Sequence, residues 1–190
     1  MGNVTTAESY AHAATTDFTA HAATTDFTAH AATTGFNAHA LTAGECADAT
    51  TTGRLAHAIT AGKVACACTT GDYAHALTAG DEADATTTGC FAHAATTGDY
   101  AHAATTGENA IATATGDHAR ASVAGENSIA VAVGYNSHAR AANGGFIVLA
   151  QYDGTAIVAV KTAQVGKDGI KPDTWYKLSH TGEFVEAEVE

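Results

Sequence analysis

A nine-residue unit repeats without slippage from about residue 11 to residue 139. It has the form Ala-His-Ala-x-Thr-x-Gly-x-x, as in residues 56–64. A unit of this size is too small to bury a core by itself, so it becomes stable only by stacking on copies of itself. The repeat therefore predicts an all-β parallel solenoid over residues 1–143, followed by a small β-rich cap domain over residues 144–190.

The side chains of the repeat indicate which of them face inward. Successive residues of a strand point to opposite sides, so Ala74, Ala76 and Thr78 share one side, and His75 and Leu77 share the other. Positions equivalent to the first set accept almost only small residues along the whole array, which is typical of a place where two sheets nearly touch. We therefore expect the Ala and Thr side chains inside, with each Thr hydroxyl bonded to a neighbouring coil.

The outward residues indicate how many strands close one coil. Between residues 41 and 88 they alternate between two series with a period of 18, whereas a triangular coil would give a period of 27. The sequence thus favours a flattened roll with two parallel sheets, two strands per coil and about seven to eight coils. At roughly 4.8 Å per coil the rod would be about 36 Å long.

The regular period ends after Asn143, and the largest apolar runs follow. Residues 146–152 and 156–165 are predicted to form an antiparallel pair of strands around a turn at Asp153-Gly154. Residues 175–179 and 183–189 are predicted to form a second pair. These two pairs would cover the end of the solenoid, because an open sheet end exposes unpaired backbone groups.

Charge and composition exclude several classes of function. The formal net charge is −12 with only eight Lys and Arg residues, so we expect no nucleic-acid partner, since phosphate binding requires a basic surface. No apolar run reaches the length of about 20 residues that a membrane span needs, and no signal peptide is recognised. The four cysteines form no CxxC pair, and free thiols indicate a reducing cytoplasm or a virion component.

One outward side of the predicted roll, which we call face one, carries a histidine row and an adjoining row that is weakly apolar. A long apolar stripe on a flat surface typically marks an interface, and a flat sheet favours a symmetric oligomer. We therefore predict self-association through face one; the alternative is a monomer whose exposed Leu and Ile residues have no role. The predicted interface residues are His39, Leu41, His57, Ile59, His75, Leu77, Ile111, Ile129, Val131 and Val133.

The histidine row has two further readings. His21, His39, His57, His75 and His93 could bind a metal ion, but a straight row on a flat surface offers too few converging ligands for a tetrahedral site, so we expect no cofactor. The same row could respond to pH, because protonation would place like charges side by side. An interface through face one should then loosen below about pH 6.

The opposite side, face two, carries threonines in a Thr-x-Thr pattern: Thr50, Thr52, Thr70, Thr86 and Thr88. This pattern resembles the ice-binding surfaces of insect antifreeze proteins, which implies ice binding as an alternative function. Catalysis is not expected, because a flat roll offers no cleft in which a nucleophile and a base could converge on a substrate.

Two family resemblances concern the repeats and the tail. Residues 125–139, Gly-Glu-Asn-Ser-Ile-Ala-Val-Ala-Val-Gly-Tyr-Asn-Ser-His-Ala, are similar to the head repeats of trimeric autotransporter adhesins, in which bulky outward residues meet at the subunit interface. The whole chain resembles uncharacterised repeat proteins of phages, prophages and gut bacteria, with tails like residues 144–150 and 170–178. Together these resemblances imply a non-enzymatic structural or interaction module of phage or prophage origin.

Overall fold

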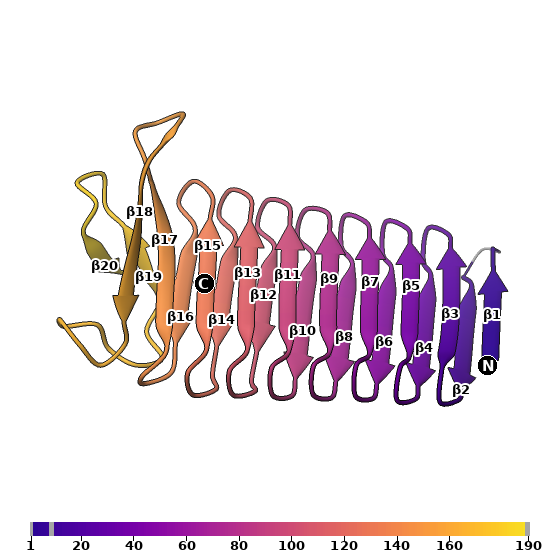
Figure 1. Ribbon diagram of the computed structural model, residues 1–190. Coiled ribbons are helices and arrows are strands. Elements are labelled where there is room, and N and C mark those ends of the chain that lie inside the picture. The colour runs from indigo at the N-terminus through magenta and orange to yellow at the C-terminus, as the bar shows by residue number, and fades with distance from the viewer. Residues whose placement is uncertain (1, 8–9, 189–190) are drawn as a thin grey trace.

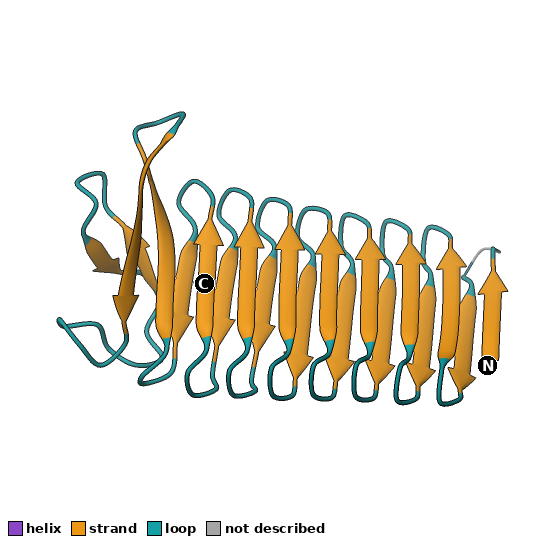
Figure 2. Ribbon diagram, in the orientation of Figure 1, coloured by secondary structure: helices purple, strands orange, loops and turns teal. Residues whose placement is uncertain are grey.

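The computed structural model describes residues 2–7 and 10–188 and shows a β-solenoid made of two ten-stranded sheets, with no helix in these residues (Figures 1 and 2). Sheet one contains, in spatial order, β1 (Gly2–Thr6), β3 (Ala20–Thr25), β5 (His39–Ala43), β7 (His57–Ala61), β9 (His75–Ala79), β11 (His93–Thr97), β13 (Ile111–Thr115), β15 (Ile129–Val133), β17 (Phe146–Tyr152) and β18 (Ile157–Gln164). Sheet two contains β2 (His12–Thr16), β4 (His30–Thr34), β6 (Asp48–Thr52), β8 (Cys66–Thr70), β10 (Asp84–Thr88), β12 (His102–Thr105), β14 (Arg120–Val123), β16 (His138–Ala141), β19 (Tyr176–Leu178) and β20 (Phe184–Glu186).

The pairing register confirms two strands per coil. Each repeat strand pairs in parallel with the strand 18 residues further along, so that His39 lies opposite His57 and Leu41 opposite Ile59. Strands β1 to β16 therefore form eight coils, at the upper end of the expected number. The chain alternates between the two sheets, which lie one behind the other in Figure 1. The predicted fold class is confirmed.

The predicted inward and outward sides are also confirmed. In β9 and the turn before it, Ala74, Ala76 and Thr78 are buried, whereas His75 is half-buried and Leu77 is exposed. The core consists of columns of alanine from both sheets, joined near the cap by larger residues such as Ile147 and Leu149. Small inward side chains let the two sheets pack at close range, which compensates for the scarcity of large apolar residues.

The expectation for the buried threonine hydroxyls is wrong. Within the described part of the chain, their Oγ1 atoms have no hydrogen-bond partner. The residue at the same position of the next coil is usually another threonine, but the hydroxyls of successive threonines form no hydrogen bond with each other. An unpaired buried hydroxyl costs about 1–3 kcal/mol, so the alanine packing and the backbone pairing must offset this cost. The hydroxyls concerned belong to Thr24, Thr33, Thr42, Thr51, Thr60, Thr69, Thr78, Thr87, Thr96 and Thr105.

The turns stack as closely as the strands. The backbone N–H of Gly62 donates to the carbonyl of Ala79 in the next coil at 2.9 Å, and the N–H of Val64 donates to the carbonyl of Glu45 in the previous one at 2.8 Å. A β-carbon on Gly62 would overlap the carbonyl oxygen of Gly44, one coil earlier. Glycine is therefore required at this position because the turns approach each other so closely.

The C-terminal strands continue both sheets across the end of the solenoid. β17 pairs in parallel with β15 and in antiparallel with β18, and this hairpin extends beyond the rim of the coils in Figure 1. β19 pairs with β16 and with β20, close to the predicted strand ranges; residue 189, the last of the predicted range 183–189, lies outside the described residues. Because the core cluster runs from the repeat alanines into Tyr176 and Ile170, the cap shares the core of the coils. The boundary at residue 143 stays a prediction about folding units.

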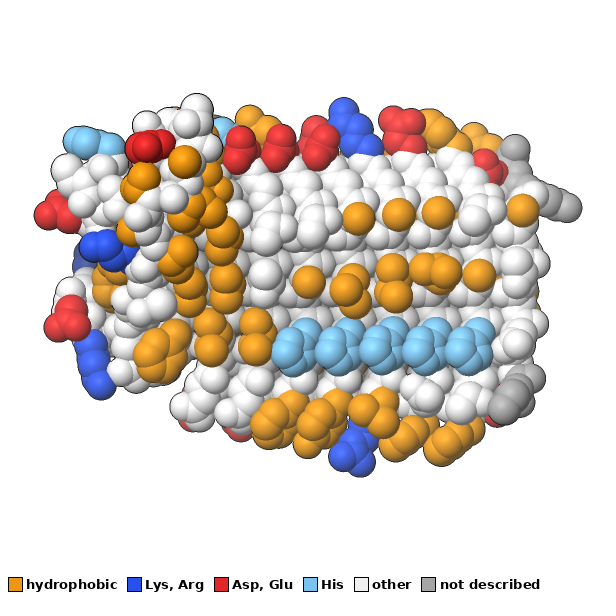
Figure 3. Space-filling view, turned by 45° about the horizontal axis from the view of Figure 1, so that its top comes forward, with side chains coloured by type: hydrophobic (Ala, Val, Ile, Leu, Met, Phe, Trp, Pro, Cys, Tyr) orange, Lys and Arg blue, Asp and Glu red, His pale blue; other side chains and the backbone are white. Residues whose placement is uncertain are grey.

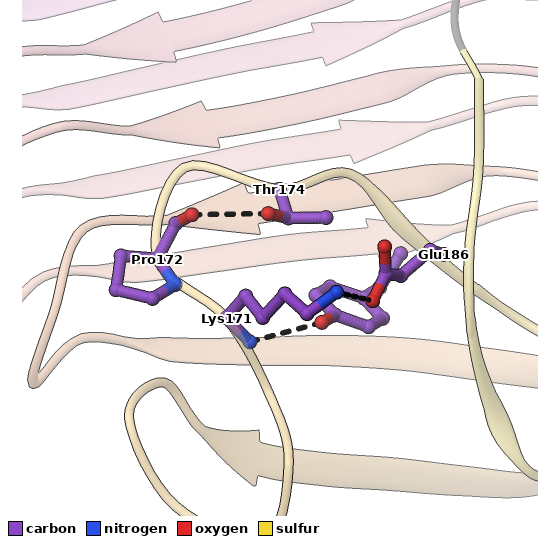
Figure 4. A network of polar contacts seen from close by, with 5 residues as sticks. Lys171, Pro172, Thr174 and Glu186 are labelled. Carbon is purple, nitrogen blue, oxygen red and sulfur yellow. Dashed lines mark hydrogen bonds and ion pairs between the residues drawn. The ribbon is translucent and has the colours of Figure 1, made fainter.

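A polar network fixes the segment that crosses the solenoid end (Figure 4). Lys171 forms an ion pair with Glu186 at 2.6 Å, and its backbone N–H donates to the hydroxyl of Tyr176 at 2.9 Å. The hydroxyl of Thr174 donates to the carbonyl of Pro172 at 3.0 Å. These contacts connect the loop before β19 to β20 and hold the buried Tyr176 ring over the last coil.

Candidate functional site

Face one is the outward surface of sheet one, and its central feature is a row of five stacked imidazoles (Figure 3). Neighbouring ring centroids are 4.8–5.0 Å apart and the ring planes differ by at most 11°. This regularity follows from the register, which places each ring directly over the equivalent residue of the next coil. The row consists of His21, His39, His57, His75 and His93.

The protonated form is disfavoured for the three central imidazoles of the row. Partial burial, and to a lesser degree the neighbouring imidazoles, lowers the pKa of His39, His57 and His75 below the usual value. These rings are therefore mostly neutral at pH 7. The middle of the row thus presents a polar but uncharged stripe along the sheet.

An apolar row runs beside the imidazoles. Leu41, Ile59 and Leu77 occupy equivalent positions in consecutive coils and are 49%, 39% and 39% exposed. Toward the cap, Ile111 and Ile129 continue the histidine row, followed by Phe146. Val131 continues the apolar row, and Val133 lies on the same strand. All ten predicted interface residues thus lie on one face, and their role as an interface stays a prediction.

The geometry of the histidine row differs from that of a metal site. Because the rings are stacked face to face, they share one orientation and do not converge on a common point. Within the described residues, no three His, Cys, Asp or Glu side chains are arranged to hold a metal ion. A metal bound to the row would therefore require the imidazoles to leave their stacked positions.

Face two, the outward surface of sheet two, has a different chemical character. His30 contacts Asp48 at 3.1 Å, and charged residues recur along the row that includes them. Near the cap, the Arg140 guanidinium lies over the Trp175 ring at 4.7 Å from its centroid. Burial lowers the pKa of His138 to about 4, with a further contribution from nearby Lys177. The first outward row reads His12, His30, Asp48, Cys66, Asp84, His102, Arg120 and His138.

The threonines predicted for ice binding lie together on face two. Thr50 and Thr86 flank Cys68 in one row, and Thr52, Thr70 and Thr88 are consecutive in the next. The sequence analysis missed that this second row is longer: Thr16, Thr34 and Thr106 extend it to six exposed threonines, one per coil. The 18-residue spacing was sufficient to find these three threonines, because successive residue numbers along the row differ by 18.

Two cysteines occupy the middle of face two. Cys66 and Cys68 project from β8 on the same side, as expected from their spacing, and their sulfur atoms are 3.2 Å apart. All four cysteines are free thiols, in agreement with the sequence analysis. The short distance between the sulfurs could not be derived from the repeat.

No helix in the described residues is long and apolar enough to cross a membrane. No protein-family model, no curated protein and no solved structure matches the chain.

Proposed function

We propose that this protein is a non-enzymatic structural module that associates with copies of itself through face one. The observation that carries the proposal is the distribution of charge. The chain has a formal net charge of −12, yet strands β1 to β17 of sheet one contain no Asp, Glu, Lys or Arg. Sheet two, with the same repeat, carries Asp48, Asp84 and Arg120 at its outward positions.

A second copy of the chain is the partner that fits this surface. Two chains of net charge −12 repel each other, and face one is the side on which they can approach without bringing carboxylates together. A two-fold axis would place the histidine and apolar rows of one copy against those of the other. The resemblance to adhesin heads, whose bulky outward residues meet between subunits, and to phage repeat proteins supports the same role.

The area of face one indicates how strongly we expect two copies to associate. Seven strands at about 4.8 Å and five residues at about 3.3 Å give a footprint of roughly 34 by 17 Å. Two copies would then bury on the order of 1,100 Å², near the lower limit for a stable interface. Association should therefore depend on concentration in the micromolar range.

The proposal is tested by Ile59→Lys, which adds a charge to the centre of face one. The wild-type chain should sediment as an oligomer at pH 7.5, and Ile59→Lys should shift it to monomer at the same concentration. Thr52→Lys, which places the same charge on face two, is the matched control and should leave the oligomer intact. Circular dichroism would verify that both variants keep the sheet signal.

The pH dependence supplies a second arm of this experiment. An interface that covers the imidazoles lowers their pKa further, so the oligomer binds fewer protons than the free chains and weakens as the pH falls. Each adjacent pair of protonated rings would add roughly 1 kcal/mol of repulsion in water. The oligomer should therefore dissociate below about pH 6. A wild-type monomer at pH 7.5, or an oligomer that Ile59→Lys leaves unchanged, would contradict the proposal.

Ice binding is a second candidate, favoured by the row of six exposed threonines on face two. Such a row repeats a methyl and a hydroxyl at the strand spacing on a flat, rigid surface. If it binds ice, the wild-type chain should inhibit ice recrystallisation, and Thr70→Tyr should abolish most of the effect because the bulky ring disrupts the flat row. Thr97→Tyr, on face one, should be harmless. Wild-type protein without any effect on recrystallisation would exclude this candidate.

A further inference from the structure

The two cysteines of β8 form a pair of thiols that the proposed function does not use. β8 lies between β6 and β10, so that Cys66 is flanked by Asp48 and Asp84, and Cys68 by Thr50 and Thr86. Both side chains are half-buried on face two, opposite the proposed interface. Self-association through face one would therefore leave them accessible.

The two sulfurs lie near each other, but the strand keeps them too far apart for a disulfide bond. Their separation is 3.2 Å, whereas a disulfide requires about 2.04 Å. Closing this gap would require β8 to buckle, and β8 is paired with a neighbouring strand on both sides along its whole length. The fold thus favours two adjacent reduced thiols over a disulfide between them.

The distance between the sulfurs fits one coordination geometry better than others. With metal–sulfur bonds of about 2.3 Å, a linear centre would need sulfurs about 4.6 Å apart and a tetrahedral centre about 3.8 Å. A centre with bond angles near 90° needs roughly 3.2–3.3 Å at the same bond length. Trivalent arsenic has three bonds in a pyramid with angles close to this value, and it prefers sulfur to oxygen or nitrogen.

The hydrogen bond between the two thiols makes one of them the better nucleophile. The thiols of Cys66 and Cys68 share a hydrogen bond, and this bond lowers the pKa of Cys68 to about 7 and raises the pKa of Cys66. Because the thiolate is the nucleophile, Cys68 reacts first. The carboxylates of Asp48 and Asp84 repel anionic thiol reagents, so the pair favours an uncharged reagent over an anionic one.

We propose that Cys66 and Cys68 form a dithiol site that chelates an uncharged trivalent arsenic compound, such as an arsonous acid carrying two hydroxyl groups. Cys68 attacks the arsenic and one arsenic–oxygen bond breaks. Cys66 then displaces the second hydroxyl group. Two arsenic–sulfur bonds form, the two thiol protons leave with the two hydroxyl groups as two molecules of water, and neither sulfur nor arsenic changes oxidation state.

The experiment uses phenylarsine oxide with the full chain, kept reduced by a phosphine, and measures binding by intact mass and by titration of free thiols. We expect one phenylarsenic group per chain and the loss of two titratable thiols. Cys66→Ser and Cys68→Ser should each weaken binding by about 10²-fold or more, because the second bond of a chelate forms at a high effective concentration. The double variant Cys46→Ser/Cys90→Ser, which retains the pair, is the matched control and should bind like the wild type.

Three results would overturn the proposal. The first is undiminished binding by Cys66→Ser or Cys68→Ser, and the second is loss of binding by the Cys46→Ser/Cys90→Ser control. The third is a wild-type chain whose Cys66 and Cys68 are already joined by a disulfide after purification without reductant and resist the phosphine. Since the affected side chains point outward, circular dichroism should show that all variants keep the fold.

Discussion

Replacing Gly62 by alanine should destabilise the solenoid by about 3 kcal/mol or more, because the added methyl group cannot be placed without moving the backbone of an adjacent coil. The new β-carbon would overlap the carbonyl oxygen of Gly44 and would also crowd that of Glu45. Separating the two turns would disrupt the bonds between them, such as that from the N–H of Val64 to the carbonyl of Glu45. Chemical denaturation followed by circular dichroism would measure the shift.

The matched control for this variant is Gly154→Ala in the hairpin between β17 and β18. Gly154 has φ of 120° and no heavy atom within 4 Å of a β-carbon, so alanine there costs only backbone strain of about 1–2 kcal/mol. Gly62 has no left-handed backbone, so its substitution isolates the steric effect. A Gly62→Ala chain that unfolds at the same denaturant concentration as Gly154→Ala would contradict the close stacking of the turns.

The second large effect is expected in the core, where Ala94→Leu should destabilise the protein by about 3 kcal/mol. Ala94 is 1% exposed and lies between Ala76 and Ala112 of the flanking coils, so a larger side chain would force the two sheets apart. A separation of this kind spreads to both neighbouring coils because each coil depends on the next for its packing.

The adjacent residue supplies the control. Ala95→Leu adds the same atoms on face one, in the row of Leu77, where they project outward. The change in stability should stay within about 0.5 kcal/mol. Thermal melting of the two variants side by side would compare them, and equal destabilisation would show that residues 94 and 95 do not face opposite ways.

The repeat made most of the fold predictable. A strict 18-residue alternation of outward residues is incompatible with three strands per coil. The restriction of positions such as 74 and 76 to alanine identified the side chains that face the core. Most of the repeat strands are four or five residues long, because the first alanine of each unit and its glycine belong to the turns. Face one was predictable for the same reason: the residues that compose it recur at a fixed interval.

The conformations of the side chains within a coil could not be predicted from the sequence. The period fixes where each α-carbon lies but not its rotamer, so neither the 3.2 Å between the sulfurs of Cys66 and Cys68 nor the unpaired hydroxyl of Thr60 could be derived. The prediction of a bond to a neighbouring coil failed because the 18-residue period places threonines of successive coils side by side without fixing the direction of their hydroxyls.

The 18-residue register also restricts how an array like this can change its length. Removing one nine-residue unit, such as that of β8, would transfer every later strand to the opposite sheet, so that His75 and Leu77 would continue the row of Asp48 and Thr50 instead of that of His57 and Ile59. Removing two consecutive units would shorten the rod by one coil and leave both surfaces continuous. Duplication and loss of coding segments should therefore be tolerated in even numbers of units, and an odd number would exchange the two sides of the molecule.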